Sequence, residues 1–156
     1  MYDYLLKNNG HSFVNEDDMW LMNMSKRLKN KTGYSIHSNQ FSDIQLVPQI
    51  SFHYKGLHFE SPLFGAHNLQ NIKAAITISD FFEVNTELIR EAIAEYHPQN
   101  NRSQIIQTDK GNTILMDAYN ANPSSVESAI KTFREMKNKP QYVVLGDMFE
   151  LGSHEA

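Results

Sequence analysis

The stretch TILMDAYNANPSS, residues 113–125, passes from an apolar run to the start of an amphipathic helix pattern. Four polar side chains stand where the first pattern ends and the second begins: Asp117, Tyr119, Asn120 and Asn122. In an open α/β sheet, ligands bind beyond the carboxyl ends of the strands. This position therefore predicts an α/β fold with a ligand site at the end of a strand.

Helix capping is an alternative explanation for part of this stretch. Either Asn122 caps a helix that begins at Pro123, or Ser124 caps it in a capping box with Glu127. Capping does not account for the three polar residues before Asn122. The Asp117 carboxylate can accept hydrogen bonds from two hydroxyl groups and suits a ribose. The Tyr119 ring offers a flat face, and the Asn120 amide offers a donor and an acceptor.

The residues around this stretch predict a βαβ unit. Two short strands separated by a turn are expected, then a helix, then an apolar strand typical of a buried parallel sheet: 103–108, 113–116, 124–136 and 141–145. The polar segment HPQNNRSQ, residues 97–104, precedes them. We therefore place a domain boundary near Asn100.

Upstream of this boundary the sequence predicts helices at both ends of a β-rich segment. A helix over 2–9, a strand over 11–14 and a helix capped by Asn15 and running to about Lys29 come first. Antiparallel strands with one buried face follow: 34–37, 44–47, 50–54 and 57–60. A long helix from about His67 or Asn68 is apolar on almost every side, which indicates burial between layers. The last helix covers 86–96 and ends before Pro98.

The segment GAHNLQN, residues 65–71, raises a second possibility of ligand binding. Asn68 and Asn71 are three residues apart and share one face of a helix start. Two amides on one face can read the donor and acceptor edge of a purine. The alternative is one helix cap and one solvated polar residue.

Composition excludes several other classes of protein. The 156 residues carry a net charge of −4, without the basic stripe that a nucleic-acid surface needs. No apolar run approaches the roughly 18 residues of a membrane span. The chain has no cysteine, which is compatible with a reducing cytoplasm, and its seven histidines lack the spacing of a zinc motif, so we predict no metal site.

Four motifs resemble, in order and spacing, those of the Mur ligase family: Gly65–Asn71 with Ala74-Ala75, Arg102, Asp117–Pro123 and Leu145–Gly152. FVNEDD, residues 13–18, resembles a further segment of the family. The resemblance is strong from Gly65 onward and weak from Thr32 to Pro62. It implies that residues 1–100 are the C-terminal part of the central ATP-binding domain, with added β-strands. Residues 101–156 would begin the Rossmann-like C-terminal domain.

The resemblance also implies a reaction. Members of the family use ATP to convert a carboxylate to an acyl phosphate, which an incoming amine attacks to give an amide. YNANP and GDMFELG are most similar to the members that add D-alanyl-D-alanine to UDP-N-acetylmuramoyl-tripeptide. ATP and Mg²⁺ would be required. The protein would act in the cytoplasm, in peptidoglycan synthesis, and so in cell shape and division.

The resemblance places six residues at the nucleotide: Asn68, Asn71, Arg102, Asp117, Tyr119 and Asn120. The two asparagines of GAHNLQN would face the adenine, Arg102 would reach the phosphates, and Asp117 would hold the ribose. Tyr119 and Asn120 would line the nucleotide between the domains. Asp147 and Glu150 are candidates for the amine side. The resemblance assigns no catalytic residue and no metal ligand within this chain.

Two departures from the family pattern qualify these expectations. Asn101 stands where the family usually has a glycine, although asparagine tolerates the left-handed conformation better than most residues. The sequence also contains no G-x-x-x-x-G-K-[S/T] phosphate loop. We therefore expect a fragment of a longer ligase. A related ligase, such as another Mur ligase or a folylpolyglutamate synthetase, and a non-catalytic nucleotide-binding module remain alternatives.

The 156-residue chain alone is expected not to form amide bonds. Positioning and phosphate stabilisation dominate phosphoryl transfer, and the residues for both are missing from the sequence. The measurement is release of inorganic phosphate that depends on both ATP and D-alanyl-D-alanine, with a full-length Mur ligase as positive control. Release above background from this chain would contradict the expectation.

Overall fold

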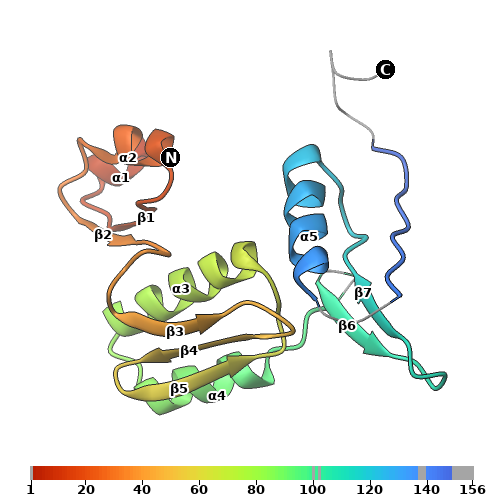
Figure 1. The fold of residues 1–156 in the computed structure, drawn as a ribbon. Helices are drawn as coiled ribbons and strands as arrows, with labels where there is room; N and C mark the ends of the chain where they lie inside the picture. The colour runs from red at the N-terminus through yellow and green to blue at the C-terminus, as the bar shows by residue number, and fades with distance from the viewer. Residues whose placement is uncertain (1, 100, 102, 137–139, 149–156) are drawn as a thin grey trace.

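The computed structural model describes residues 2–99, 101, 103–136 and 140–148, and it contains three groups of elements in chain order (Figure 1). The sheet group is the middle one. Its strands β3 (Phe41–Gln45), β4 (Ile50–Tyr54) and β5 (Leu57–Ser61) form an antiparallel sheet in that order. Helices α3 (Ala66–Phe81) and α4 (Thr86–Glu95) follow and pack with the sheet.

The main hydrophobic core lies between this sheet and its two helices. Alternate residues of β4 share one face, so Ile50, Phe52 and Tyr54 all point inward and are at most 3% exposed. The ring of Phe52 stacks on that of Phe59 from β5 at 5.1 Å between centroids. Helix α3 contributes Leu69, Ile72 and Ile76, and α4 contributes Ile89. The expectation of one buried sheet face is therefore confirmed, and this core fixes the start of α3.

Helix α3 is less completely buried than its sequence predicts. Its first three turns bury apolar residues, but Ile78 and Phe81 near its end are 37% and 44% exposed. The ring of Phe81 contacts Phe13 of β1 edge-on, at 5.2 Å between centroids. The end of α3 thus packs against the N-terminal group and not against a second layer of the sheet group.

The N-terminal group consists of four elements: α1 (Tyr2–Lys7), β1 (Ser12–Asn15), α2 (Met19–Ser25) and β2 (Lys31–Tyr34). Strands β1 and β2 pair in parallel, and α2 forms the crossover between them. The second strand was expected over 34–37 and lies three residues earlier, because its Lys31–Tyr34 segment pairs in register with β1.

The cap of α2 corrects the expectation for Asn15. Asp18 is the N-cap, because its carboxylate accepts from the backbone N–H groups of Trp20 and Leu21 at 2.8 and 3.0 Å. Asn15 instead accepts from the N–H of Asp17 in the turn before the helix. The helix also ends at Ser25, four residues before the expected Lys29.

Two side chains of opposite charge, Lys73 and Asp17, form hydrogen bonds with Ser35 and Ile36, which follow β2. Lys73 of α3 is fully buried, and its Nζ donates to the carbonyls of Ile36 at 2.7 Å and Ser35 at 3.4 Å. From the other side, Asp17 accepts from the N–H of Ile36 and the hydroxyl of Ser35. Burial lowers the pKa of Lys73, and the Asp17 carboxylate acts in the opposite direction. Nζ also lies 4.2 Å from the centre of the Phe41 ring, a cation–π distance.

The hairpin group begins after α4. Strands β6 (Gln104–Gln107) and β7 (Thr113–Met116) form an antiparallel hairpin, as predicted, and Gly111 in its turn has a φ of +77°. Helix α5 (Pro123–Glu135) follows. Asn122 caps it and accepts from the N–H of Ser125, whose hydroxyl accepts from the N–H of Asn122. Of the two capping alternatives, the one with Asn122 is therefore confirmed.

The predicted strand over 141–145 does not form. Residues 141–148 have no helix or strand, and Val144 is 95% exposed. A parallel strand needs a neighbouring strand, but β6 and β7 pair with each other, and the described part of the chain offers no third strand beside them. The predicted βαβ unit is therefore incomplete. The mixture of helices and strands still confirms the α/β class.

The predicted boundary near Asn100 lies between α4, which ends at Glu95, and β6, which begins at Gln104. Asn100 itself is outside the described residues. The boundary therefore stays a prediction. Across the described ranges, no helix is both long and apolar enough to cross a bilayer.

Replacing Lys73 with methionine is expected to lower the free energy of unfolding by about 1.5–3 kcal/mol, because the carbonyls of Ser35 and Ile36 lose a charged donor. Denaturant titration measures the change. Lys131→Met is the matched control, since Lys131 makes an exposed ion pair with Glu127 and should cost less than about 0.5 kcal/mol. Equal stabilities of the two variants would show that the buried ammonium group contributes nothing.

Candidate functional site

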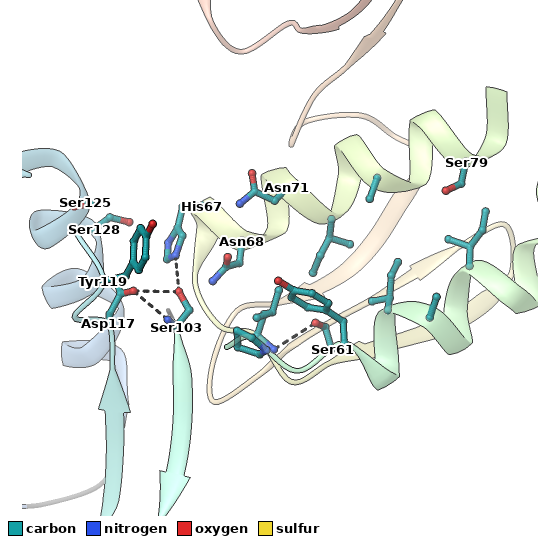
Figure 2. A pocket seen from close by; sticks show the side chains of 18 of the residues that line it. Ser61, His67, Asn68, Asn71, Ser79, Ser103, Asp117, Tyr119, Ser125 and Ser128 are labelled. Atoms are coloured by element: carbon teal, nitrogen blue, oxygen red, sulfur yellow. Dashed lines mark hydrogen bonds between the residues drawn. The ribbon is translucent and has the colours of Figure 1, made fainter. Parts of the chain in front are cut away.

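A pocket of about 850 Å³ lies between the sheet group and the hairpin group (Figure 2). One end is polar and is formed by side chains from both groups. The other end is apolar and runs between α3 and α4, where it is lined by Ile72, Ala75, Leu88, Ala92 and Ile93. The pocket is therefore amphipathic and has walls from two parts of the chain.

Five of the six residues that the resemblance placed at a nucleotide line this one pocket: Asn68, Asn71, Asp117, Tyr119 and Asn120. The sixth, Arg102, lies outside the described residues, as does Glu150. Asp147 is described, is exposed, and is not among the residues that line the pocket. Its role on the amine side stays a prediction.

Asn68 is held in place by the protein. It is 8% exposed, and its Nδ2 donates to the carbonyl of Phe64 at 2.9 Å. This bond uses one of the two N–H groups of the amide, which leaves the other N–H and the oxygen for a ligand. Asn71 lies one turn further along α3 and is exposed. A fixed amide and an exposed amide thus share the face of α3 that borders the pocket (Figure 2).

Asp117 contacts the other wall through Ser103. Its Oδ1 accepts from the backbone N–H of Ser103 at 3.1 Å and from the Ser103 hydroxyl at 3.4 Å. The Nε2 of His67, in the first turn of α3, lies 3.3 Å from the same hydroxyl (Figure 2). A chain of hydrogen bonds therefore crosses from the sheet group to the hairpin group at the polar end of the pocket.

His67 is partly buried, and one of its ring nitrogens takes part in these hydrogen bonds. Burial lowers the pKa of its imidazole, while the Asp117 carboxylate acts to raise it, and the net direction is downward. Its Nδ1 is buried and has no hydrogen-bond partner among the described residues. Both observations favour a neutral ring, because a protonated Nδ1 would need an acceptor.

Sequence reasoning missed His67 and Ser103. His67 stands inside GAHNLQN, directly before Asn68, so its place in the motif was a usable signal. Ser103 gave no such signal. Its contact with Asp117 depends on a φ of +45°. Few residues other than glycine adopt this angle, and the sequence does not predict it here.

Gly65 brings the hairpin group close to α3. It precedes α3 with a φ of +82°, and a methyl group added there would lie 3.1 Å from Oγ1 of Thr132 in α5. The same methyl group would lie 3.3 Å from the ring of His67. Glycine is therefore required both by the backbone conformation and by the approach of α5.

No group of three or more His, Cys, Asp or Glu side chains suited to a metal ion occurs within residues 2–99, 101, 103–136 and 140–148. The polar groups that line the pocket are instead one carboxylate, three amides, one imidazole, two phenols and several serine hydroxyls. These groups can exchange hydrogen bonds with a neutral polar ligand such as a nucleoside.

Comparisons with known proteins identify relatives of this chain. The family model described as "Mur ligase, glutamate ligase domain" matches residues 101–156. The UDP-N-acetylmuramoyl-tripeptide–D-alanyl-D-alanine ligase of Bacillus subtilis is 32% identical over 155 residues, which are 96% of this chain and 34% of that protein. Two crystal structures share the fold: MurF from Acinetobacter baumannii, with a TM-score of 0.67 and 23% identity, and the MurF ligase from Thermotoga maritima in complex with ADP, with 0.65 and 17%. They match 81% and 80% of this chain, and 30% of each of those chains.

The chain belongs to the Mur ligase family. Two relatives that are each 32% identical over 96% of its length are UDP-N-acetylmuramoyl-tripeptide–D-alanyl-D-alanine ligases, the members known as MurF. A UDP-N-acetylmuramate–L-alanine ligase of Hydrogenobaculum also matches 87% of the chain, at 24% identity. The chain spans about a third of the length of these curated relatives.

Replacing Gly65 with alanine is expected to destabilise the protein by about 1–3 kcal/mol, because alanine rarely adopts its backbone conformation and its methyl group would press on Thr132 and His67. Gly111→Ala is the matched control, since Gly111 also has a positive φ but faces open space. Thermal unfolding of both variants measures the difference. If Gly65→Ala cost no more than Gly111→Ala, the close approach of α5 would not constrain this site.

Proposed function

We propose that this chain is part of an ATP-dependent ligase that joins D-alanyl-D-alanine to UDP-N-acetylmuramoyl-tripeptide in peptidoglycan synthesis. The pocket between the sheet group and the hairpin group would bind the nucleotide. One observation carries the proposal. Five residues that were selected from two sequence motifs line a single pocket, although the two motifs are at least 46 positions apart, the distance from Asn71 to Asp117.

The dimensions and chemistry of the pocket suit the adenosine part of ATP. Ligand pockets commonly measure about 300–1,000 Å³ and combine an apolar lining with a few polar groups, and the pocket of about 850 Å³ has this character. The amides of Asn68 and Asn71 can read a purine edge above the apolar side chains of Ile72 and Ala75. Asp117 can accept hydroxyl groups of a ribose.

The phosphates and Mg²⁺ need groups beyond those that line the pocket. Among its described lining residues there is no lysine or arginine, and the only carboxylate is that of Asp117. Arg102 remains our candidate for the phosphates on the basis of its motif. The chain's own contribution would be to bind and orient adenosine, whereas the acyl phosphate would form on residues supplied by the rest of the ligase.

The position of the pocket suggests how ATP would act on the fold. Because the nucleotide would touch α3 on one side and the strand end of β7 on the other, its binding would hold the two groups together. Closure of this kind excludes water from a reactive acyl phosphate. The protein would work in the cytoplasm, with which the absence of cysteine is compatible.

Two alternatives remain open. A related ligase of the same family would share the nucleotide pocket and differ in the amine that it accepts, so a panel of amino acids and dipeptides distinguishes it. A non-catalytic nucleotide-binding module would bind ATP but release no phosphate with any amine. The motifs YNANP and GDMFELG favour the D-alanyl-D-alanine ligase.

Replacing Asp117 with asparagine in the full-length ligase is expected to raise the KM for ATP. Loss of a charge-assisted bond to the ribose should cost about 1.5–3 kcal/mol, and the melting temperature without ligand should change little. Asp43→Asn is the matched control, because Asp43 is also exposed and also accepts a serine hydroxyl, from Ser42, but lies outside the pocket. Unchanged ATP kinetics together with a melting temperature lower by many degrees would make Asp117 a structural residue.

A further inference from the structure

Ser103 is an unusual residue in the hairpin group. Only two residues described after Pro98 are buried, Ser103 and Thr132, at 6% and 7% exposure, and neither is apolar. Both lie against the start of α3, since Ser103 meets His67 and Thr132 meets Gly65. The most buried residues of the hairpin group are therefore polar residues that contact the sheet group.

The polarity of the hydrogen-bond chain through Ser103 follows from the chemistry of its ends. The Asp117 carboxylate can only accept, so the hydroxyl of Ser103 must donate to it. The serine oxygen then accepts from Nε2–H of His67. This order requires a proton on Nε2 of His67. Because the buried Nδ1 has no acceptor in the described part of the chain, the ring is the neutral Nε2–H tautomer.

Ser103 also fixes Asp117 through its backbone. With a φ of +45°, the Ser103 N–H points at Oδ1 of Asp117, at 3.1 Å. Both contacts from Ser103 use the same carboxylate oxygen, and the described contacts leave Oδ2 for a ligand. A left-handed backbone at a residue other than glycine is strained and persists where the surroundings enforce it.

We propose that Ser103 is a positioning residue: it holds the Asp117 carboxylate at the mouth of the pocket and, by accepting from His67, ties that carboxylate to the helix that carries Asn68 and Asn71. This inference rests on the proposed function, since it assigns to Ser103 the spacing between the groups that bind ribose and adenine. The side chain need not touch the nucleotide itself. It acts through Asp117, whose orientation it sets.

The first test reads the hydrogen-bond chain without any nucleotide. In the 156-residue chain labelled with ¹⁵N-histidine, NMR should show His67 as the Nε2–H tautomer with a slowly exchanging Nε2 proton. Ser103→Ala should abolish that slow exchange. Ser103→Gly should do the same while relieving the backbone strain, which guards against a variant that fails to fold. Ser42→Ala removes an exposed serine–carboxylate bond and should leave His67 unchanged.

The second test measures nucleotide use in the full-length ligase. Ser103→Ala and Ser103→Gly should each raise the KM for ATP roughly three- to tenfold, with kcat within about a factor of two, because the lost bonds orient Asp117 and not the reacting atoms. Ser42→Ala should change neither constant. A purely structural role would instead lower the melting temperature and leave the KM of the surviving enzyme unaltered.

The outcomes separate this inference from the proposed function. If folded Ser103→Gly keeps the wild-type His67 signature, or keeps the wild-type KM while Asp117→Asn raises it, Ser103 does not position Asp117. If neither Asp117→Asn nor the Ser103 variants alter ATP use, the nucleotide pocket itself is wrong, and the role of Ser103 falls with it. Loss of the His67 signature together with a raised KM supports the proposal.

Discussion

The burial of one face of the three-stranded sheet determines where the functional side chains lie. Ile50, Phe52 and Phe59 are fully excluded from solvent, and burying a large apolar side chain is worth about 1.5–3 kcal/mol. That face is covered by α3 and α4, whose buried residues complete the core. Covering the sheet fixes the axis and rotation of α3, and with them the direction in which Asn68 and Asn71 point.

The hairpin group depends on the same helix in a different way. It has no fully buried apolar side chain among residues 103–136, and its apolar residues Ile106 and Ile114 are 38% and 40% exposed. It meets the start of α3 at Gly65 and His67. Such a contact is small and polar, which is typical of interfaces between parts that move relative to one another. The pocket is thus formed by one rigid wall and one wall held by few bonds.

Local sequence patterns were sufficient for most of the elements. The alternation in β4 and β5 and the stripe of α4 predicted elements that the structure contains almost residue for residue, because each pattern reports burial of one face. The prediction of a strand over 141–145 was wrong. An apolar run predicts burial, but whether a strand forms also depends on a neighbouring strand elsewhere in the chain. The start of β2 and the cap of α2 were also missed, since pairing register and the choice between Asn15 and Asp18 are settled by contacts in space.

The candidate site divides along similar lines. The motifs supplied five of the polar residues that line the pocket, because motif residues were chosen for side chains that can bind a ligand. Ser103 could not be found in this way, because its importance comes from its backbone angle and its two partners. The nucleotide roles of the motif residues remain predictions until binding is measured.

The buried ammonium group of Lys73 gives the fold an internal reporter. An amine-reactive reagent can modify an exposed lysine directly, but it can reach Lys73 only when the segment at Ser35 and Ile36 separates from α3. The rate at which Lys73 is acylated, relative to that of an exposed lysine such as Lys131, is therefore a measure of local opening between the N-terminal group and the sheet group. The charged side chain that holds these two parts together is also the one whose chemical reactivity records their separation.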